Sequence, residues 1–370
     1  MEHRASREDQ RRCGAAFEQL ASGQWTGHWA QESCADCKPR RGRRATQQMG
    51  LKRTEPTPWS RGNAPPLSDL PTRTPSFKTG GGAVTPLTAT GQVYTSEMKN
   101  FGWLLFCILA SSGLAVESSV TIAGTVPGTL SLPDNAGGKL PAVLLLHGFA
   151  SQKDEVGDMY KNLAVKLAAQ GIASLRIDFQ GSGDSKVPFK QMTFTNQVSD
   201  AQAAFDYLKG RPEVDATRLG LLGFSMGGGV AIKLAANAAN PVKSLALWSS
   251  TGSRSLADLE AGSRATAEKE GVVDVDLGFT KIKLGRAFYS SLQNQNLETD
   301  IGKFRGNTMI IYGTADPLSG NAPYFLYNLQ GKIQNLVLIN GADHIYHVLT
   351  EDKSESNGVI DITVNWLRGL

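Results

Sequence analysis

The chain has 370 residues, 41% hydrophobic and 19% charged, a composition that supports a globular protein of one large domain or two ordinary ones. Its formal net charge of +4 lies at one end, because residues 1–97 hold 14 Lys and Arg against 9 Asp and Glu. The chain beyond Lys99 is slightly acidic, which argues against nucleic acid as a partner. All four cysteines precede residue 110, so disulfides cannot stabilise the rest of the chain.

Residues 1–97 are rich in Arg, Gly, Pro, Ser, Thr and Gln and show no sustained helical or strand period. We expect this segment to be disordered. Cys34 and Cys37 have the spacing of half a zinc site, but no second pair follows at ligand spacing and His28 alone does not complete four ligands. The sequence therefore predicts no metal site there.

Residues 98–115 have the pattern of a secretory signal: a short basic start at Met98, an apolar run over 101–110, and small residues before a cleavage point after Ala115. The run is too short for a comfortable membrane span. If translation begins at Met98, residues 1–97 are an upstream extension outside the native protein, which is then secreted or periplasmic. Otherwise the apolar run is a buried helix behind a disordered tail, and the protein is cytoplasmic.

From about residue 118, short β-rich runs alternate with helical patterns. We expect an opening hairpin of strands 119–126 and 129–132, turning at Pro127 and Gly128. Later apolar runs without polar alternation predict strands buried on both faces. These runs are 142–146, 173–177, 218–222, 244–248, 308–312 and 335–339. Helical periodicity appears at 160–169, 197–209, 230–239 and 359–367. The alternation predicts an α/β domain over residues 116–370, with a mostly parallel eight-stranded sheet, helices on both faces and an antiparallel start.

One interval breaks this alternation. About sixty residues separate the strand that ends near Trp248 from the strand that starts near Thr308, far more than a usual connection. We interpret residues 252–300 as a cap inserted over the C-terminal edge of the sheet, where open α/β folds bind their ligands.

Residues 223–227 read Gly-Phe-Ser-Met-Gly, directly after a predicted strand and directly before a predicted helix. In that setting the two glycines permit a sharp turn that holds Ser225 in a strained, projecting conformation. The N–H of Met226 then begins a helix and points to where a substrate oxyanion forms. This favours a nucleophilic serine, and the alternative is a glycine-rich helix start that serves only close packing.

A serine at its ordinary pKa needs a general base to act as a nucleophile. Beyond the signal-like segment the histidines are His147, His344 and His347. His344 follows the run 335–339, so we expect it at the sheet edge where Ser225 emerges. His347 remains an alternative base.

The base in turn needs a carboxylate that holds its tautomer and stabilises its charged form. Asp316 follows the run 308–312 in the same way and is our candidate. Asp178, at the end of an earlier strand, is a rival, and Asp343 is a poorer one because neighbouring loop residues rarely face each other.

The run 142–146 is followed directly by His147, Gly148 and Phe149. The glycine permits a tight turn, after which the N–H of Phe149 can converge with that of Met226 as an oxyanion site. We expect His147 to hydrogen-bond this turn rather than to take part in catalysis.

Several of these segments resemble those of α/β-hydrolases. In that superfamily the catalytic serine, acid and histidine follow one another in this order along the chain, as Ser225, Asp316 and His344 do here. The matching segments are residues 147–149, 178–185, 223–227, 313–316 and 341–344. From about residue 140 to its end, the chain is similar to the cinnamoyl and feruloyl esterase branch, whose members carry a cap between the sixth strand and the acid-bearing strand. The resemblance implies a serine esterase with Ser225, Asp316 and His344 as triad and Phe149 and Met226 as oxyanion donors.

The sequence departs from that branch in the cap, where residues 262–271 are rich in Glu, Lys and Arg. The aromatic residues that remain to stack on a phenolic acid are Phe279, Phe288 and Tyr289, of which we take Phe288 and Tyr289 as substrate-binding. This composition leaves the acyl group open.

The expected activity is hydrolysis of a small-molecule carboxylic ester through an acyl-enzyme, with no cofactor, no metal and no membrane partner. The same triad supports peptidases, thioesterases and perhydrolysis, which spacing does not separate. A hydrolase fold kept only for binding is a further alternative.

Overall fold

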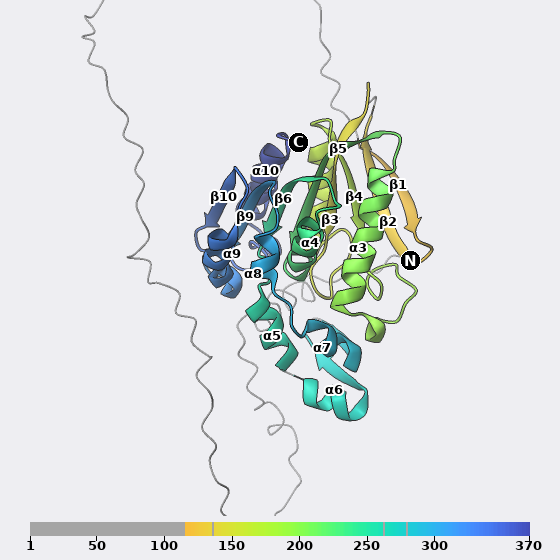
Figure 1. Ribbon diagram of the computed structural model, residues 1–370, viewed down its shortest axis with the longest axis vertical. Helices are drawn as coiled ribbons and strands as arrows, with labels where there is room; N and C mark the ends of the chain where they lie inside the picture. Colours follow the sequence, from red (N-terminus) through yellow and green to blue (C-terminus); the bar gives the residue numbers. More distant parts are fainter. Residues whose placement is uncertain (1–114, 135–136, 262, 279) are drawn as a thin grey trace, which may run out of the picture. The chain divides into compact units, whose positions relative to one another are not determined.

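An eight-stranded sheet organises the computed structural model, which describes residues 115–134, 137–261, 263–278 and 280–370 (Figure 1). The strand order is β1-β2-β4-β3-β5-β6-β9-β10. β2 runs antiparallel to both its neighbours, and the pairs from β4 to β10 are all parallel. The strands are β1 (Ala115–Ile122), β2 (Val126–Pro133), β3 (Leu140–Leu146), β4 (Ala173–Ile177), β5 (Val214–Phe224), β6 (Val242–Trp248), β9 (Asn307–Gly313) and β10 (Gln334–Ile339).

Helices cover both faces of this sheet, and two hydrophobic clusters separate them from it. Alternate residues of β3 belong to the two clusters. Leu144 lies in the cluster that contains residues of α3 (Phe194–Lys209) and α4 (Met226–Ala236), whereas Leu145 lies in the cluster that contains residues of α2 (Met159–Ala168) and α10 (Ser354–Leu367). This is the pattern expected of a strand buried on both faces. The covering helices are α2 (Met159–Ala168), α3 (Phe194–Lys209), α4 (Met226–Ala236), α9 (Ala322–Asn328) and α10 (Ser354–Leu367), with 3₁₀ turns η2 (Val156–Asp158), η3 (Phe189–Gln191) and η4 (Pro317–Asn321). The predicted fold class is confirmed.

The opening hairpin turns earlier in the chain than the sequence predicted. Its turn is at Ala123 and Gly124, both with positive φ, closed by a 3.1 Å hydrogen bond from the Thr125 N–H to the Ile122 carbonyl. Pro127 lies inside β2, one residue before the ladder with β4 begins at Gly128. Pro127 pairs with Thr121 of β1, and its carbonyl accepts the Asp178 N–H at 2.8 Å, so the position of its missing N–H faces away from β1 and lies at the end of the ladder with β4, where a proline is tolerated.

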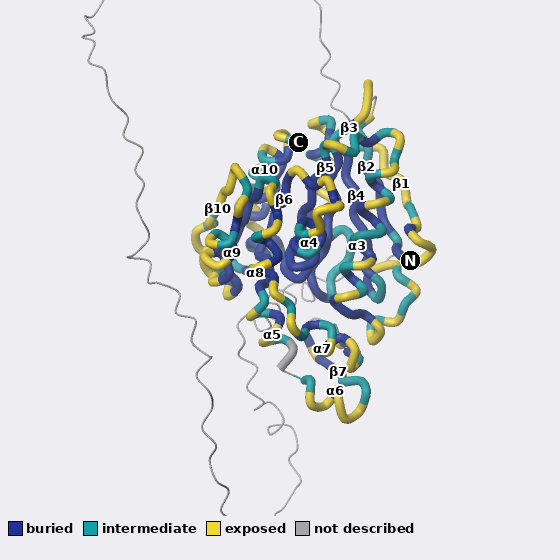
Figure 2. The backbone as a smooth tube through the Cα atoms, in the orientation of Figure 1, coloured by how far each residue is buried: buried dark blue, intermediate teal, exposed yellow. Residues whose placement is uncertain are grey.

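The last strand also differs from its prediction. β10 ends the strand order, with β9 as its neighbour, and its Leu336 and Leu338 are 36% and 53% exposed. Figure 2 shows this exposed edge beside the buried central strands. The run 335–339 is therefore apolar without being buried on both faces, because an edge strand has fewer elements packed against it.

Between β6 and β9 the chain forms a set of short elements that contains its own two-stranded sheet. In Figure 1 the helices α5, α6 and α7 lie together at one end of the large sheet. The elements are α5 (Ser253–Ala261), α6 (Arg264–Glu270), β7 (Val272–Asp276), β8 (Lys281–Gly285), α7 (Arg286–Leu292) and α8 (Leu297–Ile301). This set occupies the interval where the sequence predicted an inserted cap, and we call it the cap.

Some sequence predictions fall outside the described residues. The extension 1–97, the half zinc motif and nearly all of the signal-like segment 98–115 are among them, as is Phe279. Within the part of the chain that the structure describes, no helix has the length and apolar character needed to cross a membrane.

Candidate active site

Ser225 occupies the tight turn between β5 and α4. Its backbone has φ 53° and ψ −119°, a conformation that costs a non-glycine residue energy and is kept only where the surroundings enforce it. Three backbone hydrogen bonds hold it: the Ser225 N–H donates to the Trp248 carbonyl at 2.9 Å, and its carbonyl accepts from the N–H groups of Thr251 and Gly228, both at 3.0 Å. The residue is 5% exposed, so the hydroxyl is largely removed from bulk water.

Gly227 explains how α4 comes so close to the end of β3. A Cβ added to Gly227 would lie 2.1 Å from the Leu146 carbonyl oxygen and 2.4 Å from that of His147. No side chain fits in that space, so the glycine is required by the close approach of two backbones. The turn after β3 and the turn after β5 are thereby brought together.

His344 and Asp316 complete a hydrogen-bonded chain that starts at Ser225. The His344 Nε2 is 3.1 Å from the Ser225 Oγ, and its Nδ1 is 3.0 Å from the Asp316 Oδ1. Asp316 follows β9 and His344 follows β10, so both side chains are carried on loops at the carboxyl edge where β5 also ends. Ser225 and His344 are 119 positions apart in the sequence, and His344 and Asp316 are 28 positions apart. The fold thus brings distant residues together to form one path for a proton.

Asp316 is ionised in this arrangement. Burial raises its pKa, but the charge that the His344 ring carries when protonated, the hydrogen bond from that ring and the hydrogen bonds from Ser249 and the Leu318 N–H together outweigh burial, so the pKa of Asp316 lies below its ordinary value. A carboxylate that remains charged next to Nδ1 holds the proton on that nitrogen and leaves Nε2 to accept the serine proton.

The rival residues make other contacts. Asp178 accepts from the backbone N–H of Lys153 at 2.7 Å and from its ammonium at 2.9 Å. The His347 Nδ1 is 3.0 Å from the Glu355 carboxylate, and Asp343 accepts the backbone N–H of Ile345 at 3.0 Å. Of the candidates weighed from sequence, the structure brings together Ser225, His344 and Asp316.

His147 holds the turn after β3 from inside the core. Its Nε2 accepts from the Phe179 N–H at 3.2 Å, so its Nδ1 carries the proton and donates to the Gly148 carbonyl at 2.7 Å. Burial lowers the pKa of His147 to about 4, which keeps the ring neutral. This placement is the one predicted for it.

The predicted oxyanion donors lie beside the serine. Met226 is the first residue of α4, and its N–H has no carbonyl one turn earlier to bind. The turn that carries Phe149 touches the serine, since a Cβ added to Gly148 would lie 3.4 Å from the Ser225 Cβ.

Glu155 is a buried acid in this region that the sequence reasoning did not single out. Its carboxylate accepts the Gly148 N–H at 2.7 Å and the Ser151 hydroxyl at 2.5 Å, and the residue is 3% exposed. Burial raises the pKa of Glu155, and these hydrogen bonds oppose the rise. The only sequence signal is its place in the loop after Phe149, which marks it no more than its acidic neighbour Asp154.

The predicted substrate-binding aromatics are buried inside the protein. The Phe288 ring is tilted against the Phe149 ring at a centroid distance of 5.5 Å, and the Tyr289 ring lies edge-on to Phe288 at 5.3 Å. Phe288 is 0% and Tyr289 3% exposed. Phe288 therefore connects the cap to the turn after β3. Contact of Phe288 or Tyr289 with a substrate stays a prediction.

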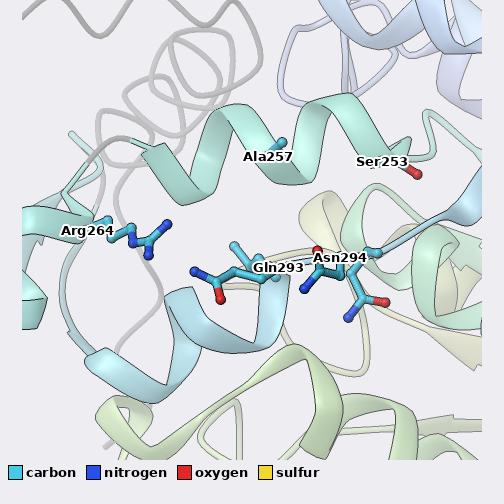
Figure 3. Close-up of a pocket in the computed structure, with 7 residues that line it drawn as sticks. Ser253, Ala257, Arg264, Gln293 and Asn294 are labelled. Carbon is cyan, nitrogen blue, oxygen red and sulfur yellow. The ribbon is translucent and has the colours of Figure 1, made fainter. Parts of the chain in front are cut away.

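A polar pocket of about 310 Å³ lies within the cap (Figure 3). In the close-up α5 lies along one side, while the Arg264, Gln293 and Asn294 side chains line the other parts. The full lining is Ser253, Ala257, Arg264, Leu292, Gln293, Asn294 and Gln295. Hydrogen-bonding side chains therefore dominate it, and neither Phe288 nor Tyr289 is among its lining residues.

Metal chemistry has no candidate site in the same region. Among the residues that the structure describes, His, Cys, Asp and Glu form no group of three able to hold a metal ion.

The sheet order, together with the strained serine next to a histidine–aspartate pair, defines the class of protein by its fold: the chain has the α/β-hydrolase fold. The family model that matches part of the chain is described as serine aminopeptidase, S33, and covers residues 139–273.

Three individual proteins illustrate what the chain is similar to. An uncharacterised protein of Mycobacterium tuberculosis is 36% identical over 104 residues, 28% of this chain and 34% of the relative, so the match spans about a third of the relative's length. The structure of Est1E from Butyrivibrio proteoclasticus with bound ferulic acid has a TM-score of 0.56 at 21% identity, covering 68% of this chain and 97% of that one. A hypothetical protein from Pseudomonas aeruginosa has a TM-score of 0.57 at 16% identity, covering 75% and 99%.

Proposed function

We propose that the protein is a serine hydrolase that cleaves carboxylic esters through an acyl-enzyme. The observation that carries the proposal is the continuous path from the Asp316 carboxylate through His344 to the hydroxyl of Ser225, with both hydrogen bonds at 3.0–3.1 Å. An activated serine in a strained turn is what acyl transfer requires.

The reaction has two steps. The Ser225 oxygen forms a bond to the ester carbonyl carbon while its proton moves to the His344 Nε2, and the carbonyl electron pair moves to the oxygen. Collapse of this intermediate breaks the carbon–oxygen bond to the alcohol, which leaves with the proton from His344. Water repeats the sequence and releases the acid. The N–H groups of Phe149 and Met226 stabilise the oxyanion in both steps.

For the substrate, we propose a cinnamoyl or feruloyl ester, or another short-acyl or aryl ester. Two features support this class: the motifs shared with that esterase branch and the likeness to Est1E, whose structure contains ferulic acid.

A peptidase is the second candidate, because the matching family model is described as a serine aminopeptidase. Thioesterase and perhydrolase chemistry use the same triad. Rates on methyl ferulate, p-nitrophenyl esters, acyl thioesters and aminoacyl amides, with peracid formation followed separately, would rank these activities, and faster turnover of the amides would favour the peptidase.

The decisive experiment replaces Ser225 by Ala. We expect hydrolysis of a p-nitrophenyl ester to fall by several powers of ten, because the nucleophile is removed while the rest of the site is kept. Labelling by a fluorophosphonate should be lost in parallel. Undiminished hydrolysis by Ser225→Ala would refute the assignment, and a wild-type protein that is neither labelled nor active would favour a hydrolase fold kept for binding.

A further inference from the structure

We propose that Glu155 is a positioning residue that sets the oxyanion donor of the turn after β3. The inference rests on the proposed esterase function and deepens it, since it concerns how the N–H of Phe149 is aimed at the reacting oxygen.

Three hydrogen bonds hold the Glu155 carboxylate in place. One carboxylate oxygen, Oε2, accepts the Gly148 N–H at 2.7 Å, and the other, Oε1, accepts the Ser151 hydroxyl at 2.5 Å and the Val156 N–H at 2.9 Å. Its backbone has φ 61°, a conformation rare for a residue with a side chain, which persists only where the surroundings impose it. A buried carboxylate with three donors is a rigid anchor.

The anchor decides which N–H groups of the turn are available. The Gly148 N–H is taken by Glu155, so it cannot serve an oxyanion. The Gly148 carbonyl accepts from the His147 Nδ1 at 2.7 Å and from the Ser151 N–H at 3.3 Å. In a planar trans peptide the carbonyl and the following N–H point in opposite directions. Fixing the Gly148 carbonyl therefore directs the Phe149 N–H away from His147 and leaves it as the donor of this turn.

The turn has no room to relax without moving relative to the serine. The space where a Gly148 Cβ would sit is 2.9 Å from the Phe224 ring and 3.4 Å from the Ser225 Cβ. Glu155 is also close enough to His344 for a positive charge on that ring to lower the pKa of Glu155. Loss of the anchor should shift the Phe149 N–H by a fraction of an ångström, and oxyanion stabilisation depends steeply on that distance.

The test replaces Glu155 by Gln, which keeps the size but points an NH₂ group at one of the three donors. On a p-nitrophenyl ester we expect kcat to fall about 10- to 100-fold with KM within about threefold, because the donor acts on the transition state and not on the bound ester. Inhibition by an aryl trifluoromethyl ketone, which forms an oxyanion on Ser225, should weaken by a similar factor. Inhibition by the matching amide, which forms none, should stay unchanged.

Two further variants separate positioning from general stability. Asp200→Asn removes another carboxylate that is 3% exposed and accepts a backbone N–H, that of Gln180 at 2.8 Å, and it should leave kcat and ketone inhibition within about twofold. Ser151→Ala removes one donor to Glu155 and keeps the carboxylate, so it should lower kcat by a smaller factor even if Glu155→Gln fails to fold.

Wild-type kcat and wild-type ketone inhibition in folded Glu155→Gln would overturn the inference, as would equal losses in Asp200→Asn. If Glu155→Gln does not fold, an unchanged Ser151→Ala would overturn it. Failure of the proposed esterase function can be distinguished from failure of the Glu155 inference. In the first case the wild-type protein itself shows neither turnover nor fluorophosphonate labelling.

Discussion

Burial is the main cause of the protonation state of His147. The residue is fully buried, its pKa is lowered to about 4, and its two ring nitrogens have different roles, one accepting and one donating. A protonated ring would lose its acceptor and leave the Phe179 N–H without a partner. The folded protein therefore requires the neutral form.

This requirement predicts a dependence of stability on pH. Because the pKa of His147 is lower in the folded state than its ordinary value of 6.5, the unfolded chain takes up a proton first as pH falls. The contribution of His147 is fully present above about pH 6.5 and is lost progressively down to about pH 4, by about 3 kcal/mol in total. Denaturant unfolding of wild type and of His147→Gln at pH 7.5 and pH 4.5 measures it. We expect wild type to lose more stability than the variant, and equal losses would contradict the assignment.

Residue type singled out the proposed triad because its members are chemically distinctive. Three histidines and a Gly-x-Ser-x-Gly segment leave few combinations, and each partner follows a predicted strand. Glu155 lies in no motif of this kind, and a sequence does not reveal which of its acidic residues is buried. Its place became visible only from its hydrogen bonds to Gly148 and Ser151.

At the scale of elements, the turn from β5 to α4 is where the sequence pattern and the backbone agree most closely. The predicted strained serine has φ 53°, and the helix begins at the next residue, Met226. The opening hairpin shows the opposite case, because Pro-Gly is a common turn signal but a proline is also tolerated where a strand extends past its neighbour's ladder. Local signals are ambiguous wherever pairing partners decide the outcome.

The β5–α4 turn also yields a prediction with an internal control. Gly227→Ala places a methyl group 2.1 Å from the Leu146 carbonyl oxygen, so α4 must move away from β3. We expect a loss of about 1–3 kcal/mol or more in the free energy of unfolding, together with reduced labelling of Ser225 by a fluorophosphonate. Gly358→Ala in α10 meets no atom within 4 Å and should instead be neutral or stabilise by up to about 1 kcal/mol. Equal stability of the two variants would contradict the close approach of α4 and β3.

At the scale of the whole described domain, the cap and the sheet are coupled through aromatic contacts. Phe149, on the turn after β3, packs against Phe288 of α7 at 5.5 Å and against Phe189 of η3 at 6.0 Å. The cap is therefore connected to the same turn that carries the proposed oxyanion donor. Movement of α7 should change the position of that turn.

Replacement of Phe288 by Ala tests this coupling. Removing a fully buried ring should cost about 3–5 kcal/mol of stability and, in the fraction that remains folded, lower kcat on a p-nitrophenyl ester. Phe325→Ala removes an equally buried ring from α9, so it should cost similar stability and leave kcat unchanged. The comparison is made at a temperature where both variants are folded by circular dichroism. Identical kcat values in both would show that α7 does not hold the turn.

The sequence by itself determined the fold class, the number of strands in the large sheet and the three residues that the structure joins by hydrogen bonds at Ser225. It could do so because hydrophobic periodicity, strand-to-helix glycines and the order of polar residues after strands are local properties of the chain. Tertiary structure alone decided the hairpin turn, the exposed face of β10, the burial of Phe288 and Tyr289 and the place of Glu155. Each of these depends on which distant segments pack together, and that packing leaves no mark at the residues themselves.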